Sequence, residues 1–206
     1  MLDDYLMEGQ FYSDRISKEQ DGFTKVLSYY FSNKKYKNLR ILNLCCGPIT
    51  EEQVLFEYFG SQTEIISIDR DPQFEILAKE FKRKTFKLGD ILALEKLVTG
   101  KFDIIFGRNI PLNPNHNLLE EQDIDMWPDL FRDLVNYMNI HSKLFLTFCR
   151  DDEYFRAMYI LKQNKYDIKM AEENKIIVPS DRLGVAGADI KDNYVIMAQS
   201  PICLNL

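Results

Sequence analysis

The spacing of hydrophobic residues changes along the chain, and each spacing predicts one kind of secondary structure. Apolar residues recur three and four positions apart in several segments, which is the period of an amphipathic helix. These segments are 23–31, 54–59, 74–81, 130–138 and 154–161. Short apolar runs, typical of strands covered on both faces, lie between them. These runs are 41–46, 65–68, 85–88, 102–106 and 144–149.

Strand and helix alternate repeatedly before the pattern changes near the end of the chain. There, residues 166–170 alternate between apolar and polar, and short apolar runs follow at 176–178 and 194–198. This order predicts an α/β fold with a doubly wound, mostly parallel sheet that closes with a hairpin-like edge. We expect one domain over residues 1–206, in which a helical segment at 1–37 precedes a core at 38–206.

The composition fits a single hydrophobic core and offers little to a metal ion. The chain has 206 residues, of which 46% are hydrophobic. It has four cysteines without a C-x-x-C pair and only two histidines, so we expect no metal site. The cysteines are expected to be reduced thiols, as in a cytoplasmic protein. No apolar stretch approaches the roughly 18 residues of a membrane helix, so no membrane partner is expected.

The charge balance favours a small-molecule partner over a nucleic acid. The formal net charge is -6, which opposes the attraction to phosphate backbones that usually begins nucleic-acid binding. One basic cluster lies at 79–87, and lysines of this kind are common in the last turn of a helix. We therefore interpret the cluster as a solvated helix end. The sequence leaves the oligomeric state open.

Polar residues follow the predicted strands at the points where those strands end. In a parallel sheet these ends share one rim, where ligands bind. Asp69 follows the second strand and is well placed to accept the hydroxyl groups of a ribose. The alternative for Asp69 is a helix cap, but Asp71 before Pro72 already fits that role. Asp90 follows the third strand as either an adenine contact or an ordinary turn residue.

The turn after the first strand disfavours a phosphate ligand. It has Gly47 but none of the glycine-rich loops that bind phosphate, and Pro48 removes one backbone donor. Glu51 and Glu52 add negative charge to the first turn of the helix that follows. A nucleoside with a zwitterionic tail fits this environment better than a phosphate does. The two glutamates are also explained by simple complementation of the helix dipole.

Four segments together resemble the motifs of class I S-adenosylmethionine-dependent methyltransferases. The first motif, the glycine-rich turn that holds the methionine part of the cofactor, is similar to 42–48. The second, with an acidic residue on the ribose hydroxyls, is similar to 66–72, and the third, at the adenine, to 88–91. The fourth strand and its exit are similar to 102–109. The resemblance covers about 38–200 and implies a Rossmann-like, seven-stranded sheet with a reversed closing strand.

The resemblance implies a set of cofactor-binding residues. In it, Asp69 holds the ribose, Asp90 meets the adenine amine and Ile91 packs on the adenine ring. The implied set is Asn43, Cys45, Cys46, Gly47, Asp69, Arg70, Asp90, Ile91, Gly107, Arg108 and Asn109. The chain departs from the family where Asn43 replaces an acidic residue and where Cys45 and Pro48 replace glycines.

The implied reaction is transfer of a methyl group from S-adenosylmethionine to a small-molecule acceptor. Alignment and exclusion of water can supply much of the acceleration in such a transfer, so a dedicated base is optional. His116, in the polar stretch after the fourth strand, is the candidate base, although an exposed loop histidine is the simpler interpretation. The unusual first motif leaves open a transfer of the cofactor's aminocarboxypropyl group. A noncatalytic binding protein with the same fold is a third interpretation.

Overall fold

A seven-stranded sheet forms the centre of the computed structural model, in the order β3-β2-β1-β4-β5-β9-β6. The structure describes residues 9–31, 38–47, 50–80, 85–110, 112, 121–176, 179–180, 190–191 and 193–201. The strands of the sheet are β1 Arg40–Leu44, β2 Glu64–Asp69, β3 Phe86–Leu88, β4 Phe102–Arg108, β5 Met138–Phe148, β6 Asp167–Glu173 and β9 Tyr194–Gln199. β9 runs antiparallel to both β5 and β6, whereas the pairs from β3 to β5 are parallel. The predicted doubly wound sheet with a reversed closing strand is confirmed.

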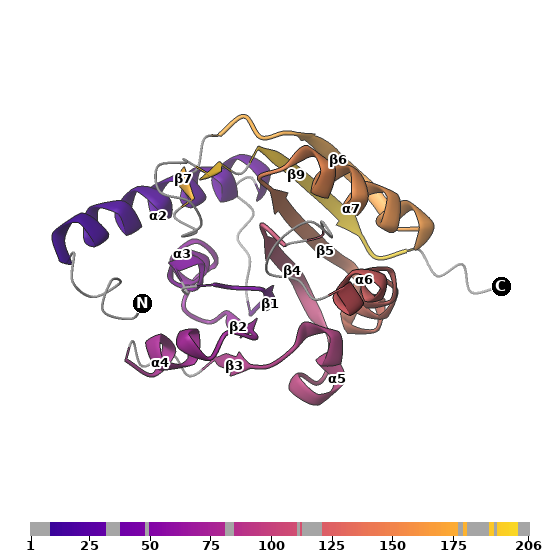
Figure 1. Cartoon of the computed structure of the whole chain (residues 1–206), viewed down its shortest axis with the longest axis horizontal. Helices are drawn as coiled ribbons and strands as arrows, with labels where there is room; N and C mark the ends of the chain where they lie inside the picture. The colour runs from indigo at the N-terminus through magenta and orange to yellow at the C-terminus, as the bar shows by residue number, and fades with distance from the viewer. Residues whose placement is uncertain are drawn as a thin grey trace.

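Helices cover both faces of the sheet. In Figure 1, α2 and α3 lie on one side of the sheet, and α6 and α7 lie on the other. The α-helices are α2 Gly9–Phe31, α3 Thr50–Phe59, α4 Pro72–Glu80, α5 Leu94–Leu97, α6 Glu121–Leu134 and α7 Asp151–Gln163. Short 3-10 helices are η1 Ile91–Ala93 and η2 Val135–Tyr137. β7 Pro179–Ser180 and β8 Ile190–Lys191 pair outside the main sheet.

Alternate residues of β1 enter different cores, as expected for a strand covered on both faces. Ile41 packs in the cluster that α2 and α3 share with the sheet, which includes Phe31 and Phe106. Leu42 and Leu44 pack in the second cluster, beneath α6 and α7. The face on which a strand residue lies can therefore be read from its position in this alternation.

Two helix boundaries follow from local chemistry that the sequence displays. Asp71 caps α4, because its Oδ1 accepts the backbone N–H of Gln73 over 2.9 Å. Gly60 ends α3 with a φ of 96°, a left-handed conformation that glycine adopts without steric cost. Asp71 is the helix cap that the sequence predicts, and the structure confirms it.

Three boundaries differ from the predictions. α2 begins at Gly9 rather than near Phe23, because its first half lacks the apolar periodicity that marks the second half. α6 begins at Glu121, inside the polar stretch after the fourth strand and well before the apolar period at 130–138, and Pro128 lies within the helix. Met138 begins β5 and is not the last residue of a helix, because the chain turns through η2 before it.

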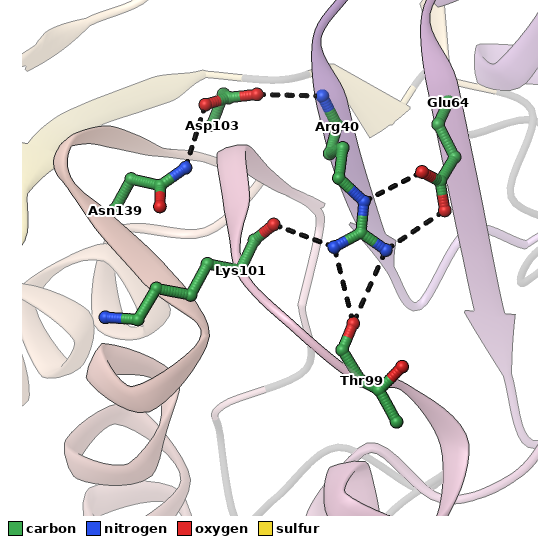
Figure 2. Close-up of polar contacts among 6 residues, drawn as sticks. All are labelled: Arg40, Glu64, Thr99, Lys101, Asp103 and Asn139. Carbon is green, nitrogen blue, oxygen red and sulfur yellow. Dashed lines mark hydrogen bonds and ion pairs between the residues drawn. The ribbon is translucent and has the colours of Figure 1, made fainter.

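A cluster around Arg40 joins the amino-terminal ends of the strands, opposite the rim where the predicted site lies. The Arg40 Nε and Nη2 bind the two carboxylate oxygens of Glu64 over 2.7 and 3.0 Å. Its guanidinium also donates to the backbone oxygens of Thr99 and Lys101 (Figure 2). Asp103 accepts the backbone N–H of Arg40 over 2.9 Å. This cluster stabilises β1, β2 and β4 at the end remote from the candidate site.

Candidate cofactor site at the carboxyl ends of the strands

The turn after β1 has an unusual backbone. Cys45 and Gly47 both have left-handed conformations, with φ values of 52° and 55°. Such a conformation costs a residue with a Cβ roughly 1–2 kcal/mol, so Cys45 occupies a position that suits glycine. The backbone N–H of Cys46 donates to the oxygen of Ile68 over 3.1 Å, which ties the turn to β2. Strained turns of this kind are concentrated at ligand sites.

Asp69 connects this turn with the ends of the two neighbouring strands. Its Oδ2 accepts the backbone N–H of Gly47 over 2.9 Å, and its Oδ1 accepts that of Asp71 over 3.0 Å. Its backbone oxygen accepts the N–H of Gly89, after β3, over 2.9 Å. A carboxylate offers about four acceptor positions, so these two side-chain bonds leave room for ribose hydroxyls. Ribose binding by Asp69 remains a prediction with suitable geometry.

The predicted adenine residues lie directly after β3. Asp90 is exposed, and its Oδ1 accepts the backbone N–H of Leu92 over 2.9 Å, so it caps η1. Ile91 is 7% exposed and packs in the cluster beneath α6 and α7. Arg70 is exposed at the end of β2. Asp90 therefore has a structural role in addition to the adenine contact that remains predicted for it.

The end of β4 is shaped by Gly107 and Asn109. A Cβ on Gly107 would lie 2.2 Å from Cδ1 of Ile110 and 2.9 Å from Cδ2 of Leu146, so a larger residue there would displace the ends of these two side chains. Asn109 has a φ of 50°, and its N–H donates to the oxygen of Thr147 over 2.8 Å. The strand exits of β1 and β4 thus both contain a non-glycine residue in the left-handed region.

A buried polar cluster joins β1, α3 and β4 on the side that α2 covers. The Nη1 of Arg108 lies 3.3 Å from Oε1 of Glu51, and their side chains are 5% and 7% exposed. Asn43 Nδ2 donates to the other carboxylate oxygen of Glu51 over 3.5 Å. The guanidinium carbon of Arg108 lies 5.7 Å from the centre of the Phe23 ring, on α2. Two predicted cofactor residues, Asn43 and Arg108, therefore meet at Glu51, which the prediction did not include.

Glu52 has a different set of partners and fixes α3 to the edge of the sheet. Its carboxylate accepts hydrogen bonds from Ser67 over 3.0 Å and from Thr85 over 2.6 Å. Both glutamates are buried, so they do more than complement the helix dipole from the surface. Their negative charge nevertheless lies in the first turn of α3, as the argument against a phosphate ligand requires.

The thiol of Cys46, in the turn, is neutral. Burial raises the pKa of Cys46 well above its ordinary value, and the nearby carboxylate of Asp69 raises it further. The Cys46 Sγ lies 3.8 Å from the backbone oxygen of Gly47, as a weak donor. Cys46 is therefore a packing residue of the turn and is not a thiolate nucleophile.

Some predicted residues lie outside the part of the chain that the structure describes, and some residues of the site were not predicted from the sequence. His116 lies outside the described residues, as does Pro48. Glu51 and Thr147 were not predicted as site residues, although a polar threonine within the apolar run of β5 was a signal.

In the part of the chain that the structure describes, no group of three metal-binding side chains lies together. No helix among those residues has the length and apolar character of a membrane span.

A groove of about 490 Å3 lies elsewhere, between η1, α5 and the second half of α6. Its lining carries the charged side chains of Glu95, Asp129, Arg132 and Asp133, and it includes Ile91 from the predicted cofactor set. None of the residues in the β1 turn or at the end of β4 lines this groove. The converging strand ends are the better candidate site, because the predicted motifs meet there.

Comparison with known proteins identifies the fold. No model of a known protein family matches the chain, and no curated protein matches its sequence. Solved structures of methyltransferases do match. Fibrillarin from Aeropyrum pernix, with natively bound S-adenosyl-L-methionine, is 15% identical with a TM-score of 0.57, over 85% of this chain and 72% of that chain.

Two further solved structures of methyltransferases also match this chain. Ribosomal protein L11 methylase from Lactobacillus delbrueckii subsp. bulgaricus is 13% identical, with a TM-score of 0.56, over 86% of this chain and 77% of that chain. Precorrin-6y C5,15-methyltransferase from Geobacter metallireducens is 14% identical, with a TM-score of 0.55, over 80% and 81%. This chain has the fold of the S-adenosylmethionine-dependent methyltransferases, as the motif resemblance implies.

Proposed function

We propose that this protein is an S-adenosylmethionine-dependent methyltransferase with a small-molecule acceptor. The main support is Asp69, whose carboxylate binds the backbone of the β1 turn and of the β2 exit at the carboxyl rim of the sheet. An acidic residue at this point, within this fold, is placed to accept the two hydroxyls of a ribose. S-adenosylmethionine, when bound, supplies a methyl group on a positively charged sulfur.

The residues of the site fit such a cofactor. Gly47 and Cys45 give the turn the left-handed backbone that a close approach of a ligand requires. The carboxylates of Glu51 and Asp69 lie at the same rim, where they favour a positively charged ligand over a phosphate. Gly107 lets the side chains of Ile110 and Leu146 pack closely against the end of β4. The contribution of these residues is to bind and orient, which is the main requirement of methyl transfer.

The charge of the chain favours a small-molecule acceptor. The net charge of -6 opposes a polyanionic acceptor. The structural matches include one protein named for a ribosomal protein and one named for precorrin-6y, so the shared fold does not decide between acceptor classes. The charge balance is what favours the small molecule.

A cytoplasmic location accompanies this proposal. Cys45, Cys46 and Cys149 are free thiols, and Cys45 and Cys149 are partly exposed. Reduced, partly exposed thiols are typical of a reducing compartment. Fractionation of the source cells, with the protein detected by antibody, tests this point. Recovery in a membrane or extracellular fraction would contradict it.

Isotope labelling separates the proposed reaction from its alternatives. The protein is incubated with S-adenosylmethionine deuterated on the methyl group, together with cell extract divided into small-molecule and macromolecular fractions. The proposal predicts a trideuteromethyl mass gain in the small-molecule fraction. A gain in the macromolecular fraction contradicts the acceptor class. Transfer of the aminocarboxypropyl group, detected with cofactor labelled in that group, contradicts methyl transfer, and no label in either fraction favours a noncatalytic protein.

A further inference from the structure

Polar residues replace the apolar ones on the face under α2 and α3 as the strands approach the rim. In each of three strands, an apolar residue of that cluster is followed, two positions later, by a polar residue on the same face. Ile41 is followed by Asn43, Phe106 by Arg108, and Phe145 by Thr147. All three polar residues are buried. They form a polar layer at the carboxyl ends of β1, β4 and β5, beneath α2.

Glu51, in the first turn of α3, completes this layer and forms its one full charge pair with Arg108. Taking both groups out of water costs several kcal/mol per ion, and a single ion pair seldom repays that cost. A structural link between α3 and β4 could be made with apolar side chains at lower cost. The retention of the pair at the predicted cofactor rim, 3.3 Å apart and nearly inaccessible, therefore indicates a binding role.

A second observation points to a ligand at the same place. Thr147 is the register partner of Arg108 across the β4–β5 pair, so the two side chains lie side by side on one face. Thr147 is 1% exposed, and among the residues that the structure describes its Oγ1 has no hydrogen-bond partner. A buried hydroxyl without a partner is costly, and a ligand that supplies one removes the cost.

The chemistry of the layer matches an α-amino acid. Its anionic group is Glu51, its cationic group is Arg108, and Asn43 and Thr147 add neutral polar groups. Asn43 carries an amide where the methyltransferase family that this chain resembles has an acid. The Nδ2 of Asn43 lies 3.5 Å from the carboxylate of Glu51. The negative charge is thus supplied by α3 instead of β1.

We propose that Glu51 and Arg108 bind the amino-acid end of S-adenosylmethionine by exchanging partners. In the free protein they pair with each other. In the complex, the Glu51 carboxylate binds the ammonium group, whereas the Arg108 guanidinium and the Thr147 hydroxyl bind the carboxylate. The exchange leaves no buried charge without a counter-charge, which a one-sided contact would do. This inference rests on the proposed function. It assigns the selectivity of the site for the zwitterionic end of the cofactor to Glu51 and Arg108.

Two related nucleosides test the assignment by calorimetric titration. S-adenosylhomocysteine carries the amino-acid end, and 5′-methylthioadenosine lacks it. The variants are Glu51→Gln and Arg108→Gln. Glu52→Gln is the matched control, because Glu52 is an adjacent buried carboxylate whose partners are Ser67 and Thr85. The measured quantity is the ratio of the two affinities for each variant, with thermal unfolding recorded in parallel.

In the wild type, we expect S-adenosylhomocysteine to bind more tightly than 5′-methylthioadenosine. Glu51→Gln and Arg108→Gln should each weaken S-adenosylhomocysteine by about tenfold or more, as for loss of a charged hydrogen bond, and leave 5′-methylthioadenosine nearly unchanged. Glu52→Gln should preserve the wild-type ratio. Should Arg108→Gln fail to fold, Arg108→Lys and Thr147→Val give the same test with smaller changes in the same direction.

Each remaining outcome overturns a different statement. If the variants weaken both nucleosides equally, or weaken neither, the Glu51–Arg108 pair is a structural link and the inference is wrong. If Glu52→Gln lowers the ratio as much as Glu51→Gln does, the effect belongs to α3 as a whole, which also overturns it. If the wild-type protein binds neither nucleoside at millimolar concentration, the proposed function fails, and the inference fails with it.

Discussion

The backbone N–H of Gly47 donates to Oδ2 of Asp69 over 2.9 Å, so the predicted ribose residue also holds the turn of the first motif in place. The second oxygen of the same carboxylate accepts the N–H of Asp71. One side chain thereby sets the conformation of two loops that come from neighbouring strands. We therefore expect cofactor binding and the local backbone to be coupled through Asp69.

Asp69→Asn should weaken binding of S-adenosylhomocysteine by about 1–3 kcal/mol, because the amide loses charge and one of its positions becomes a donor. Isothermal titration calorimetry measures this directly. Asp71→Asn is the matched control, since Asp71 caps α4 two residues away and should affect thermal stability more than affinity. Equal losses of affinity in the two variants would show that Asp69 acts only on the loop backbone.

Gly107→Ala should lower the free energy of unfolding by about 1–3 kcal/mol, because the added methyl overlaps Ile110 and Leu146. Urea unfolding measures the change. The double variant Gly107→Ala/Ile110→Val removes the Cδ1 atom that lies 2.2 Å from the new Cβ, so it should recover part of the loss. Gly60→Ala is the control, because φ is 96° there and a Cβ on Gly60 would have no neighbour within 4 Å. Ile110→Val should not rescue this variant. Absence of rescue at Gly107 would mean that the contact with Ile110 does not cause the loss.

The Arg40–Glu64 pair should contribute pH-dependent stability. Arg40 lowers the pKa of Glu64 below its ordinary value of 4.5, chiefly through the hydrogen bond between them. A carboxyl group whose pKa is lower in the folded state stabilises the protein above its unfolded pKa and loses that effect as pH falls. Because Glu64 is half-exposed, the contribution is below about 1 kcal/mol.

Urea unfolding of the wild type and of Glu64→Gln tests this pair. The wild type should be the more stable protein at pH 7, and the difference should shrink as pH falls below 4.5. The wild type and Glu64→Gln should have equal affinities for S-adenosylhomocysteine. The Arg40 cluster (Figure 2) lies at the amino-terminal ends of the strands, away from the candidate site. A difference that stays constant down to pH 3 would show that the effect is not electrostatic.

Thiol labelling should distinguish the two cysteines of the turn. Burial and a raised pKa keep Cys46 protonated and covered, whereas Cys45 is partly exposed. Iodoacetamide at pH 8, followed by peptide mass spectrometry, should modify Cys45 before Cys46. Cys46 should react only after unfolding. Equal rates for the two residues in the folded protein would contradict the described turn.

Local chemistry was the part of the fold that the sequence revealed most directly. Asp71 before Pro72 and Gly60 after an apolar helix face act within one turn of the chain, so their effect does not depend on distant residues. The boundary between α6 and β5 was misplaced because Met138 continues the spacing of Leu134. The periodicity persists through η2, where the backbone has already turned.

The contacts of the buried polar layer could not be predicted from the sequence. Glu51 and Arg108 are 57 positions apart, and nothing in the local pattern of either residue indicates its partner. Charges at the start of a helix are usually exposed, and here α2 covers them because Phe23 packs over the guanidinium. The motifs predict a site at the carboxyl ends of the strands. The contacts proposed to select a ligand there depend on packing between α2, α3 and β4.

Calorimetric titration of the wild-type protein with S-adenosylhomocysteine decides whether the carboxyl rim of the sheet is a cofactor site. We expect saturable binding to one site per chain, weakened by Asp69→Asn and unaffected by Glu64→Gln. Inorganic pyrophosphate, a ligand of phosphate-binding turns, should neither bind nor compete. Absence of heat with millimolar S-adenosylhomocysteine, or competition by pyrophosphate, would contradict the assignment of this rim as an S-adenosylmethionine site.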